Sequence, residues 1–203
     1  MVPMPDNSPR FRRISREVRR ELLIEAGLAC LAKGGILGFT FERICKQANV
    51  SRGLITHHFG SKDNLLAAIY ETMIGRLLAL VEGNSGGMDS IIDAVFTDSG
   101  EQRKTLRIWL ALWGEIANTP ALLKAHRKQY ARYRAAVETA LADLARQRGT
   151  HPDIRMAAIM FISLVDGLWL EWSIDPRQIS IAEARAACWR LLDPMFGPSG
   201  SRA

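Results

Sequence analysis

Two short segments that favour helices, separated by a three-residue turn, occupy residues 40–59. Thr40 and Ser51 each stand where a side-chain oxygen can cap the first turn of a helix, and the turn between the segments ends at Ser51. Ile44 and Ile55 supply apolar side chains where the two helices would cross. A helix pair of these dimensions is a helix-turn-helix, so this stretch predicts a small helical module near the start of the chain.

The rest of the chain also has helical rather than strand-like periodicity, which predicts an all-α protein. A first helix from Ser15 to about Lys33 completes an N-terminal three-helix module, and a long helix follows Gly60-Ser61. The expected later helices are approximately Met88–Asp98, Gln102–Ala117, Pro120–Arg148, Asp153–Ile174 and Ser180–Asp193. We predict a module over 1–62, a helical ligand-binding and dimerisation domain over 63–196, a seam at the glycine-rich loop 83–87, and a frayed tail over 197–203.

Positive charge is concentrated in the first third of the chain. Residues 1–62 contain 11 Lys and Arg against 5 Asp and Glu, whereas residues 63–203 contain 16 of each. This asymmetry indicates an anionic partner for one end of the molecule, with nucleic acid as the first candidate and a solvated basic tail as the alternative.

The second helix of the pair has the side chains that a DNA major groove admits. Ser51, Thr56 and His57 are short and polar, Gly53 allows close approach of the backbone, and Arg52 can bind a guanine edge or a phosphate. Lys62 begins the next helix, where its charge and the free N–H groups of the helix terminus can hold a phosphate together.

The stretch from Thr40 to Leu66 reads TFERICKQANVSRGLITHHFGSKDNLL, and it resembles the DNA-binding signature of TetR-type transcriptional regulators. The resemblance implies an all-helical homodimer without enzymatic activity that binds a palindromic double-stranded DNA operator. It also implies DNA contact by seven residues: Thr40, Arg43, Ser51, Arg52, Thr56, His57 and Lys62. Thr56 departs from the family, which commonly has a tyrosine there and uses its hydroxyl to contact phosphate.

The adjacent histidines His57 and His58 raise the question of a metal or catalytic site. Neighbouring residues on a helix point about 100° apart, and no Cys, Asp or Glu stands at ligand spacing, so we expect no metal there. No nucleophile with a matched base and orienting residue is evident, which argues against catalysis, and no cofactor is expected. We expect His57 to face DNA and, from the family resemblance, His58 to pack into the module.

The second region carries two tryptophan pairs next to acidic residues. Trp109 and Trp113 are four residues apart and precede Glu115; Trp169 and Trp172 are three apart and follow Asp166. Tryptophan faces beside carboxylates suit a cationic ligand, above all a quaternary ammonium. The alternative is that the tryptophans fill an ordinary helical core or a dimer seam.

The second region also resembles the ligand-binding part of BetI-type regulators, the TetR-type repressors of betaine synthesis that respond to choline. The resemblance rests on WLALWGEIANTPALLKAHRKQYARYR, from Trp109 to Arg134, and on VDGLWLEW, from Val165 to Trp172. A small hydroxyl residue at Thr56 is also closer to this subfamily. The resemblance implies a small-molecule effector such as choline or another quaternary ammonium. The alternative within the same class of regulator is a different small hydrophobic or cationic ligand.

Two further stretches carry structural expectations. The basic run from Lys124 to Arg134, which includes Tyr130 and Tyr133, is interpreted as the solvated face of a long helix rather than a second nucleic-acid surface. The last two helices are rich in apolar residues and predict an isologous four-helix dimer seam. The residues expected there are Ile159, Ile162, Leu164, Leu168, Ala182, Ala186, Trp189 and Leu192.

These observations together predict a ligand-released repressor in the cytoplasm. Three scattered cysteines fit a reducing compartment, the N-terminus lacks the apolar core of a signal peptide, and no run of about 18 apolar residues indicates a membrane span. Two alternatives from other classes stay open: a helical small-molecule-binding or enzymatic domain whose basic end is incidental, and an interaction module that pairs through its C-terminal helices without specific DNA binding.

Overall fold

The computed structural model describes residues 15–82, 87–97 and 100–197, and within these ranges every regular element is an α-helix. The helices are α1 (Arg16–Gly38), α2 (Phe41–Ala48), α3 (Arg52–Phe59), α4 (Lys62–Glu82), α5 (Gly87–Val95), α6 (Gln102–Ile116), α7 (Pro120–Arg148), α8 (Ile154–Ile174) and α9 (Ile181–Phe196). The all-α prediction is therefore confirmed. Most of the loop expected over 83–87, and all of the expected tail except Gly197, lie outside the described residues.

The helix boundaries follow local signals in the sequence. Ser15, Thr40 and Asp153 accept hydrogen bonds from backbone N–H groups in the first turns of α1, α2 and α8. Ser180 and Glu183 form a complete capping box at the start of α9. The first helix continues beyond the expected stop: Gly35 leaves helical geometry with φ 56°, which kinks α1, and a short last stretch then reaches Gly38.

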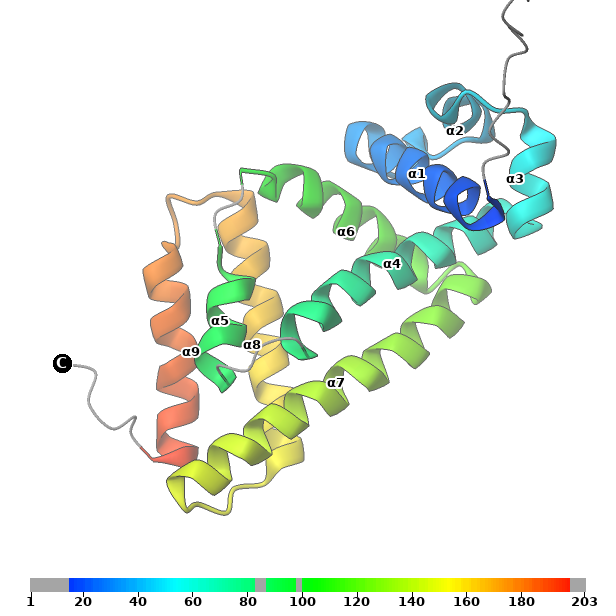
Figure 1. Ribbon diagram of the computed structural model, residues 1–203. Helices are drawn as coiled ribbons and strands as arrows, with labels where there is room; N and C mark the ends of the chain where they lie inside the picture. Colours follow the sequence, from blue (N-terminus) through cyan, green and yellow to red (C-terminus); the bar gives the residue numbers. More distant parts are fainter. Residues whose placement is uncertain (1–14, 83–86, 98–99, 198–203) are drawn as a thin grey trace, which may run out of the picture.

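The helices α1 to α3 form one end of the molecule, and α8 and α9 lie at the other end (Figure 1). The helix α4 joins the two parts, because it packs against α1 and α3 at its start and against α5 and α7 further along. The helix α6 packs against α1, α7 and α8. Two elements of the larger region, α4 and α6, therefore touch the first helix of the module.

Gly27 allows α1 and α4 to approach each other closely. A Cβ atom at this position would lie 2.5 Å from Cδ1 of Ile69 on α4 and 3.1 Å from Cε2 of Phe39. On the same helix Leu23, Cys30 and Leu31 are all buried. The small module is thus fixed to α4 by tight apolar packing.

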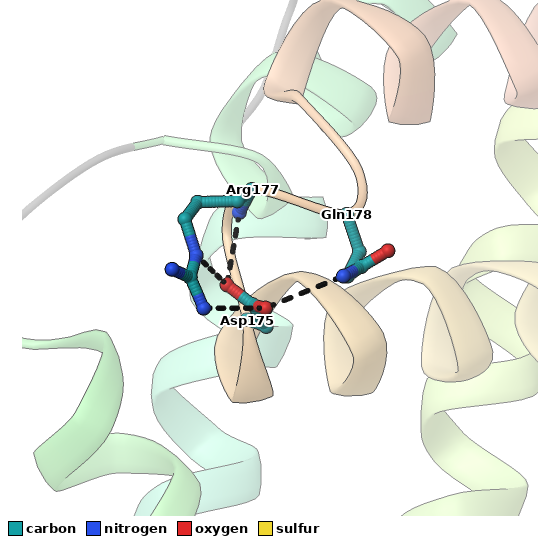
Figure 2. A network of polar contacts seen from close by, with 3 residues as sticks. All are labelled: Asp175, Arg177 and Gln178. Carbon is teal, nitrogen blue, oxygen red and sulfur yellow. Dashed lines mark hydrogen bonds and ion pairs between the residues drawn. The ribbon is translucent and has the colours of Figure 1, made fainter.

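A polar network closes the turn between α8 and α9 (Figure 2). The Asp175 carboxylate accepts hydrogen bonds from the Arg177 backbone N–H at 3.2 Å, from its Nε at 2.9 Å, and from Nε2 of Gln178 at 3.5 Å. This network stabilises the reversal of the chain, so that α9 packs back along α8.

The helix α8 is the one helix among the described residues that is long and apolar enough to cross a membrane by length and composition. The sequence criterion of an uninterrupted apolar run had indicated no such segment. Contacts of α8 with α6, α7 and α9 place it within the helical bundle, and these contacts bury 39% of its apolar window.

Candidate functional site

The predicted pair of short helices forms as expected, and its crossing is apolar. Ile44 of α2 and Ile55 of α3 are fully buried. Asn49 ends α2 in the left-handed conformation, with φ 52° and ψ 52°, and the Val50 N–H donates to the Cys45 carbonyl at 3.0 Å. These contacts fix the turn that orients α3 relative to α2.

Ser51 occupies the N-cap position of α3, but its side chain makes no capping hydrogen bond. The prediction that Ser51 caps this helix is wrong in this respect, because the first turn is closed by the Leu54 N–H donating to the Ser51 backbone carbonyl at 3.1 Å. The Ser51 side chain is exposed. Its hydroxyl is thus available to a partner outside the chain.

The outer face of α3 is polar and exposed at every position proposed for DNA contact. Arg52, Gly53, Thr56 and His57 are all exposed, and a Cβ atom on Gly53 would meet nothing closer than Oγ of Ser51 at 3.9 Å. The Arg52 guanidinium lies 4.6 Å from the centre of the Phe41 ring, which orients it without burying it. This face can enter a groove without rearrangement of the core.

The proposed contacts on α2 and α4 flank this face. Thr40 is exposed and its Oγ1 accepts the Arg43 N–H at 3.3 Å, while the exposed Arg43 side chain lies beside Gly34 at the end of α1. Lys62 begins α4, whose first turn is closed by Ser61 Oγ accepting the Asn64 N–H at 3.1 Å. The half-buried Lys62 side chain is therefore held at a helix N-terminus, where phosphate binding is favoured.

The two histidines occupy different environments. His57 is exposed and His58 is half-buried, and their rings lie 5.4 Å apart in an edge arrangement. Burial, followed by the charges of His57 and of three arginines on α1, lowers the pKa of His58. His58 thus belongs to the packing of the module. Among the residues that the structure describes, no cluster of three or more His, Cys, Asp or Glu side chains could hold a metal ion.

Three arginines at the start of α1 extend the basic surface beyond the residues chosen from the sequence. Arg16, Arg19 and Arg20 lie near His58, and the Arg20 guanidinium is 5.2 Å from the centre of the Phe59 ring on α3. Their spacing of three and four residues in a basic region is the signal that could have identified them.

A cavity of about 400 Å³ lies between the module and the larger region. Six helices, α1 and α4 to α8, contribute residues to its wall, together with Glu101 at the start of α6. Four of the six residues predicted for a ligand site line it: Trp109, Trp113, Asp166 and Trp169. The structure thus brings together side chains that are up to 60 residues apart in sequence.

The other two predicted residues do not line this cavity. Glu115 is two residues from Trp113, so the turn of the helix places it about 200° away, on another face of α6. Trp172 is 5% exposed and lies in the helical core. The core alternative therefore describes Trp172, and it also describes Trp189, which is buried with the Arg148 guanidinium 5.2 Å from its ring centre.

Aromatic rings form a continuous wall at one end of the cavity. Trp113 lies 5.7 Å from Trp109 and 6.4 Å from Trp169, measured between ring centres. Tyr70 meets Trp109 edge-on at 6.0 Å, and its hydroxyl lies 2.8 Å from Nδ1 of His126. Burial and then the charge of Arg127 lower the pKa of His126, which favours a neutral imidazole in this wall.

The helix α7 adds two tyrosines to the same wall. Tyr133 is 3% exposed and Tyr130 is half-buried, so the prediction that the run from Lys124 to Arg134 is a solvated face is wrong for both. It holds for the charged residues Lys124, Arg127, Lys128 and Arg132, all of which are exposed. The buried stripe that continues to Val137 and Leu141 was the signal that could have placed the tyrosines inward.

Asp166 is the acidic residue of this aromatic end. Its carboxylate forms no hydrogen bond or ion pair with the described residues. The Asp166 side chain is exposed at the cavity wall, and partial desolvation by the surrounding protein raises its pKa to about 6. Burial and then the nearby charge of Asp166 raise the pKa of Tyr70 and Tyr130. An uncompensated carboxylate inside an aromatic wall favours a cation.

The expected dimer seam divides into exposed and buried positions. Ile159 on α8 and Ala182 and Ala186 on α9 are exposed, and Met156, Met160 and Ile174 add to the exposed apolar surface of α8. Leu164 and Leu168 are half-buried. Ile162 and Leu192 are fully buried within the protomer and Trp189 nearly so, and these three therefore cannot form a seam with a second chain.

Both regions match known protein families. Residues 23–69 match the family described as bacterial regulatory proteins of the tetR family, and residues 87–197 match the BetI-type transcriptional repressor C-terminal family. The chain is 29% identical to the HTH-type transcriptional regulator BetI of Stenotrophomonas maltophilia, over 87% of this chain and 92% of that protein. It is 29% identical to BetI 1 of Chromohalobacter salexigens, over 92% and 94%.

Solved structures share the fold. A transcriptional regulator from Pseudomonas aeruginosa PAO1 superposes with a TM-score of 0.81 at 35% identity, over 92% of this chain and 94% of that one. A regulator from Saccharomonospora viridis, solved in complex with choline, superposes with a TM-score of 0.69 at 18% identity, over 88% and 97%. Together with the family matches, this likeness shows that the chain belongs to the TetR family of DNA-binding transcriptional regulators, which are not enzymes, and that it carries a BetI-type C-terminal domain.

Proposed function

We propose that this regulator is a homodimeric repressor that is released from its operator when an organic cation binds in the aromatic cavity. The observation that carries the proposal is the position of that cavity. Its wall includes α4, which begins beside the recognition helix α3, and also α1, so a ligand there contacts the framework that holds the DNA-binding face. The BetI-type match is to a family of repressors, which supports repression.

The DNA-binding face is formed by Thr40, Arg43, Ser51, Arg52, Gly53, Thr56, His57 and Lys62. In a twofold dimer, two copies of α3 would enter adjacent major grooves of a palindrome, with half-sites about 34–36 Å apart. Binding to the DNA upstream of its own gene, measured by fluorescence anisotropy, should weaken steeply with salt because lysines and arginines displace counterions. Affinity that stays flat between low and high salt would contradict this part of the proposal.

The dimer would form through the exposed apolar surface of α8 and α9. Met160 is exposed and lies on α8, away from the cavity wall and from the DNA-binding face. The substitution Met160→Glu places a charge in the seam and should yield monomers in sedimentation, with loss of binding to a palindrome. Leu110→Glu, at an exposed apolar position on α6, is the matched control. A Met160→Glu protein that remains a dimer would exclude this seam.

The effector would be an organic cation, with choline as the first compound to test. The aromatic wall and the uncompensated Asp166 carboxylate favour an effector with a single positive charge. The fold similarity to a choline-bound regulator supports the same choice. Calorimetry with choline and tetramethylammonium should show binding that Asp166→Asn weakens. The absence of heat from both compounds at millimolar concentration would contradict a cation effector and would favour a neutral apolar ligand in the same cavity.

The proposal places the protein in the cytoplasm, where a regulator meets its operator. Genes for choline or betaine transport and oxidation beside this one would fit a repressor of that pathway, and a reporter fused to their promoter tests it. Loss of the repressor should raise expression, and the added cation should do the same in cells that contain the wild-type protein.

A further inference from the structure

The residues that line the cavity follow α4 and α6 and change in chemistry along these helices, so we describe the cavity as a slot with two ends. On α6 its wall runs from Thr105 through Ile108 to Trp113, and on α4 it runs in the opposite direction, from Leu77 to Tyr70. Eight residues of helix span about 12 Å, so the slot extends roughly that far from the aromatic end. A ligand that occupied the aromatic end alone would leave the remainder filled with water.

The middle of the slot is apolar. Leu28 of α1, Met73 and Leu77 of α4, Val95 of α5 and Ile108 of α6 line this part. These side chains offer no charge and no strong hydrogen-bonding group, so a chain of methylene groups is the chemistry that they favour.

The far end is charged but balanced. Arg76 pairs with Glu25 of α1 at 2.5 Å, and Lys104 pairs with Glu101 at 3.2 Å. Each positive charge at this mouth thus has its own carboxylate, in contrast to Asp166, which has no cationic partner among the described residues. This charge distribution favours a ligand with one cationic group, at the aromatic end, and with no charged group at the mouth.

The volume leads to the same conclusion. Choline has about seven non-hydrogen atoms, and at no more than roughly 30 Å³ each, the share of a water molecule in the liquid, these fill about half of a 400 Å³ cavity. The other half corresponds to the apolar part of the slot.

We propose that the effector is a monovalent organic cation that carries an apolar chain, with its ammonium group between Asp166 and the tryptophans and its chain along α4 and α6 toward α1. This inference rests on the proposed cation site and specifies the class of compound that fills it. Because Glu25 and Leu28 belong to α1, only a ligand with the chain reaches the DNA-binding module directly. Long-chain cations should therefore release DNA more completely than short ones at equal occupancy.

The test is calorimetry of the full chain with tetramethylammonium, hexyltrimethylammonium and octyltrimethylammonium, each below its micelle concentration. Burial of each added methylene should strengthen binding by about three- to fourfold until the slot is full. Octyl sulfate, which has the same chain and the opposite charge, should bind at least tenfold more weakly than octyltrimethylammonium, because its head would face Asp166.

A variant of the slot separates the chain from the head group. Thr105 is half-buried on the slot wall, and Thr105→Trp should fill the apolar part. This variant should bind octyltrimethylammonium at least tenfold more weakly than the wild-type protein does, and it should bind tetramethylammonium with unchanged affinity. Leu110→Trp, at an exposed position of the same helix, is the matched control and should change neither.

The outcomes distinguish this inference from the proposed function. If choline and tetramethylammonium bind but longer chains bind no more tightly, the chain subsite is wrong and the cation effector stands. If Thr105→Trp weakens short and long cations equally, the chain subsite is also wrong. If octyl sulfate binds as tightly as octyltrimethylammonium, the cation site at Asp166 is wrong, and the inference that rests on it is rejected. If none of the cations binds, the cation effector itself is rejected and the inference is rejected with it.

Discussion

The two binding regions of this protein are opposite in shape and charge. The face around α3 is convex, exposed and basic, and its residues come from one continuous stretch of about 25 residues. The cavity is concave, aromatic and acidic at one end, and its residues come from six helices. Under the proposed function, the exposed basic face would bind a polyanion, and the cavity would bind a single cation that acts on the packing between helices.

The largest effect is expected on operator affinity when basic residues of the face around α3 are replaced. Arg52→Ala together with Lys62→Ala should weaken operator binding about 100-fold or more, because a base-contacting arginine contributes about 1–3 kcal/mol and a phosphate-binding lysine adds to it. The salt dependence should also decrease by about one counterion for each phosphate that the variant no longer neutralises. Anisotropy at several salt concentrations measures both quantities.

A basic residue of the larger region provides the control. Lys128 is exposed on α7, in the second basic stretch, and Lys128→Ala should leave operator affinity unchanged within about twofold. If Lys128→Ala weakened DNA binding as much as the double variant, the assignment of DNA to the first third alone would fail.

The second effect concerns the acidic end of the cavity. The Asp166 carboxyl has a pKa raised to about 6 in the free protein, so its carboxylate is largely present at pH 7 and largely protonated at pH 5. Cation affinity should therefore fall about tenfold between pH 7 and pH 5. Calorimetry at the two pH values measures the change, and Asp166→Asn should bind weakly at both.

Titratable groups near Asp166 can also contribute to the pH dependence of cation affinity. Burial raises the pKa of Tyr70 and Tyr130, which therefore stay neutral, whereas the lowered pKa of His126 can bring its protonation into the acidic part of the range. A pH dependence that persists in Asp166→Asn would assign the titration to His126 and would contradict the role given to Asp166.

The same contrast explains how much could be predicted from the sequence. Caps at Thr40, Ser61 and Ser180 and breaks at Gly60 and Gly149 act within a few residues, so the helices and the DNA-binding face follow from local patterns. The cavity depends on tertiary packing. Tyr70 and His126 are 56 residues apart, and no local pattern indicates that their side chains meet at 2.8 Å.

Helix geometry accounts for the mixed result with the tryptophans and their acids. Trp109 and Trp113, four residues apart, share a face of α6 and line the cavity, as expected from their spacing. Glu115 was chosen for its proximity in sequence, although the turn of the helix directs it elsewhere. The missing hydrogen bond of Ser51 depends on rotamer detail that residue types alone do not specify.

The smallest effects are expected from two glycines. Gly53 is exposed on α3, and Gly27 is buried where α1 packs against α4. Gly53→Ala adds a methyl group in open space and should raise the free energy of unfolding by up to about 1 kcal/mol through helix propensity. It should nevertheless weaken the binding of operator DNA severalfold, because in the proposed complex the backbone at Gly53 approaches the groove. Thermal unfolding and anisotropy give the two values.

Gly27→Ala should instead lower the free energy of unfolding. Its methyl group would meet Cδ1 of Ile69 at 2.5 Å and the Phe39 ring at 3.1 Å; because Ile69 can shift only within a packed core and Ala gains helix propensity, we expect a net loss of about 1 kcal/mol in the free energy of unfolding. Unchanged stability of Gly27→Ala would show that α1 and α4 are not as closely packed as described.

The central claim is that the cavity and the DNA-binding face are coupled, and the affinity for operator DNA with and without a saturating cation tests it most directly. A ligand changes DNA binding only if it binds the two states of the regulator with different affinity, and couplings of this kind are typically about 5- to 150-fold. We predict that the cation weakens operator binding at least tenfold in the wild-type protein and that Asp166→Asn requires a higher cation concentration for the same effect. Equal operator affinity of the wild-type protein with and without a cation that calorimetry shows to be bound would contradict the account.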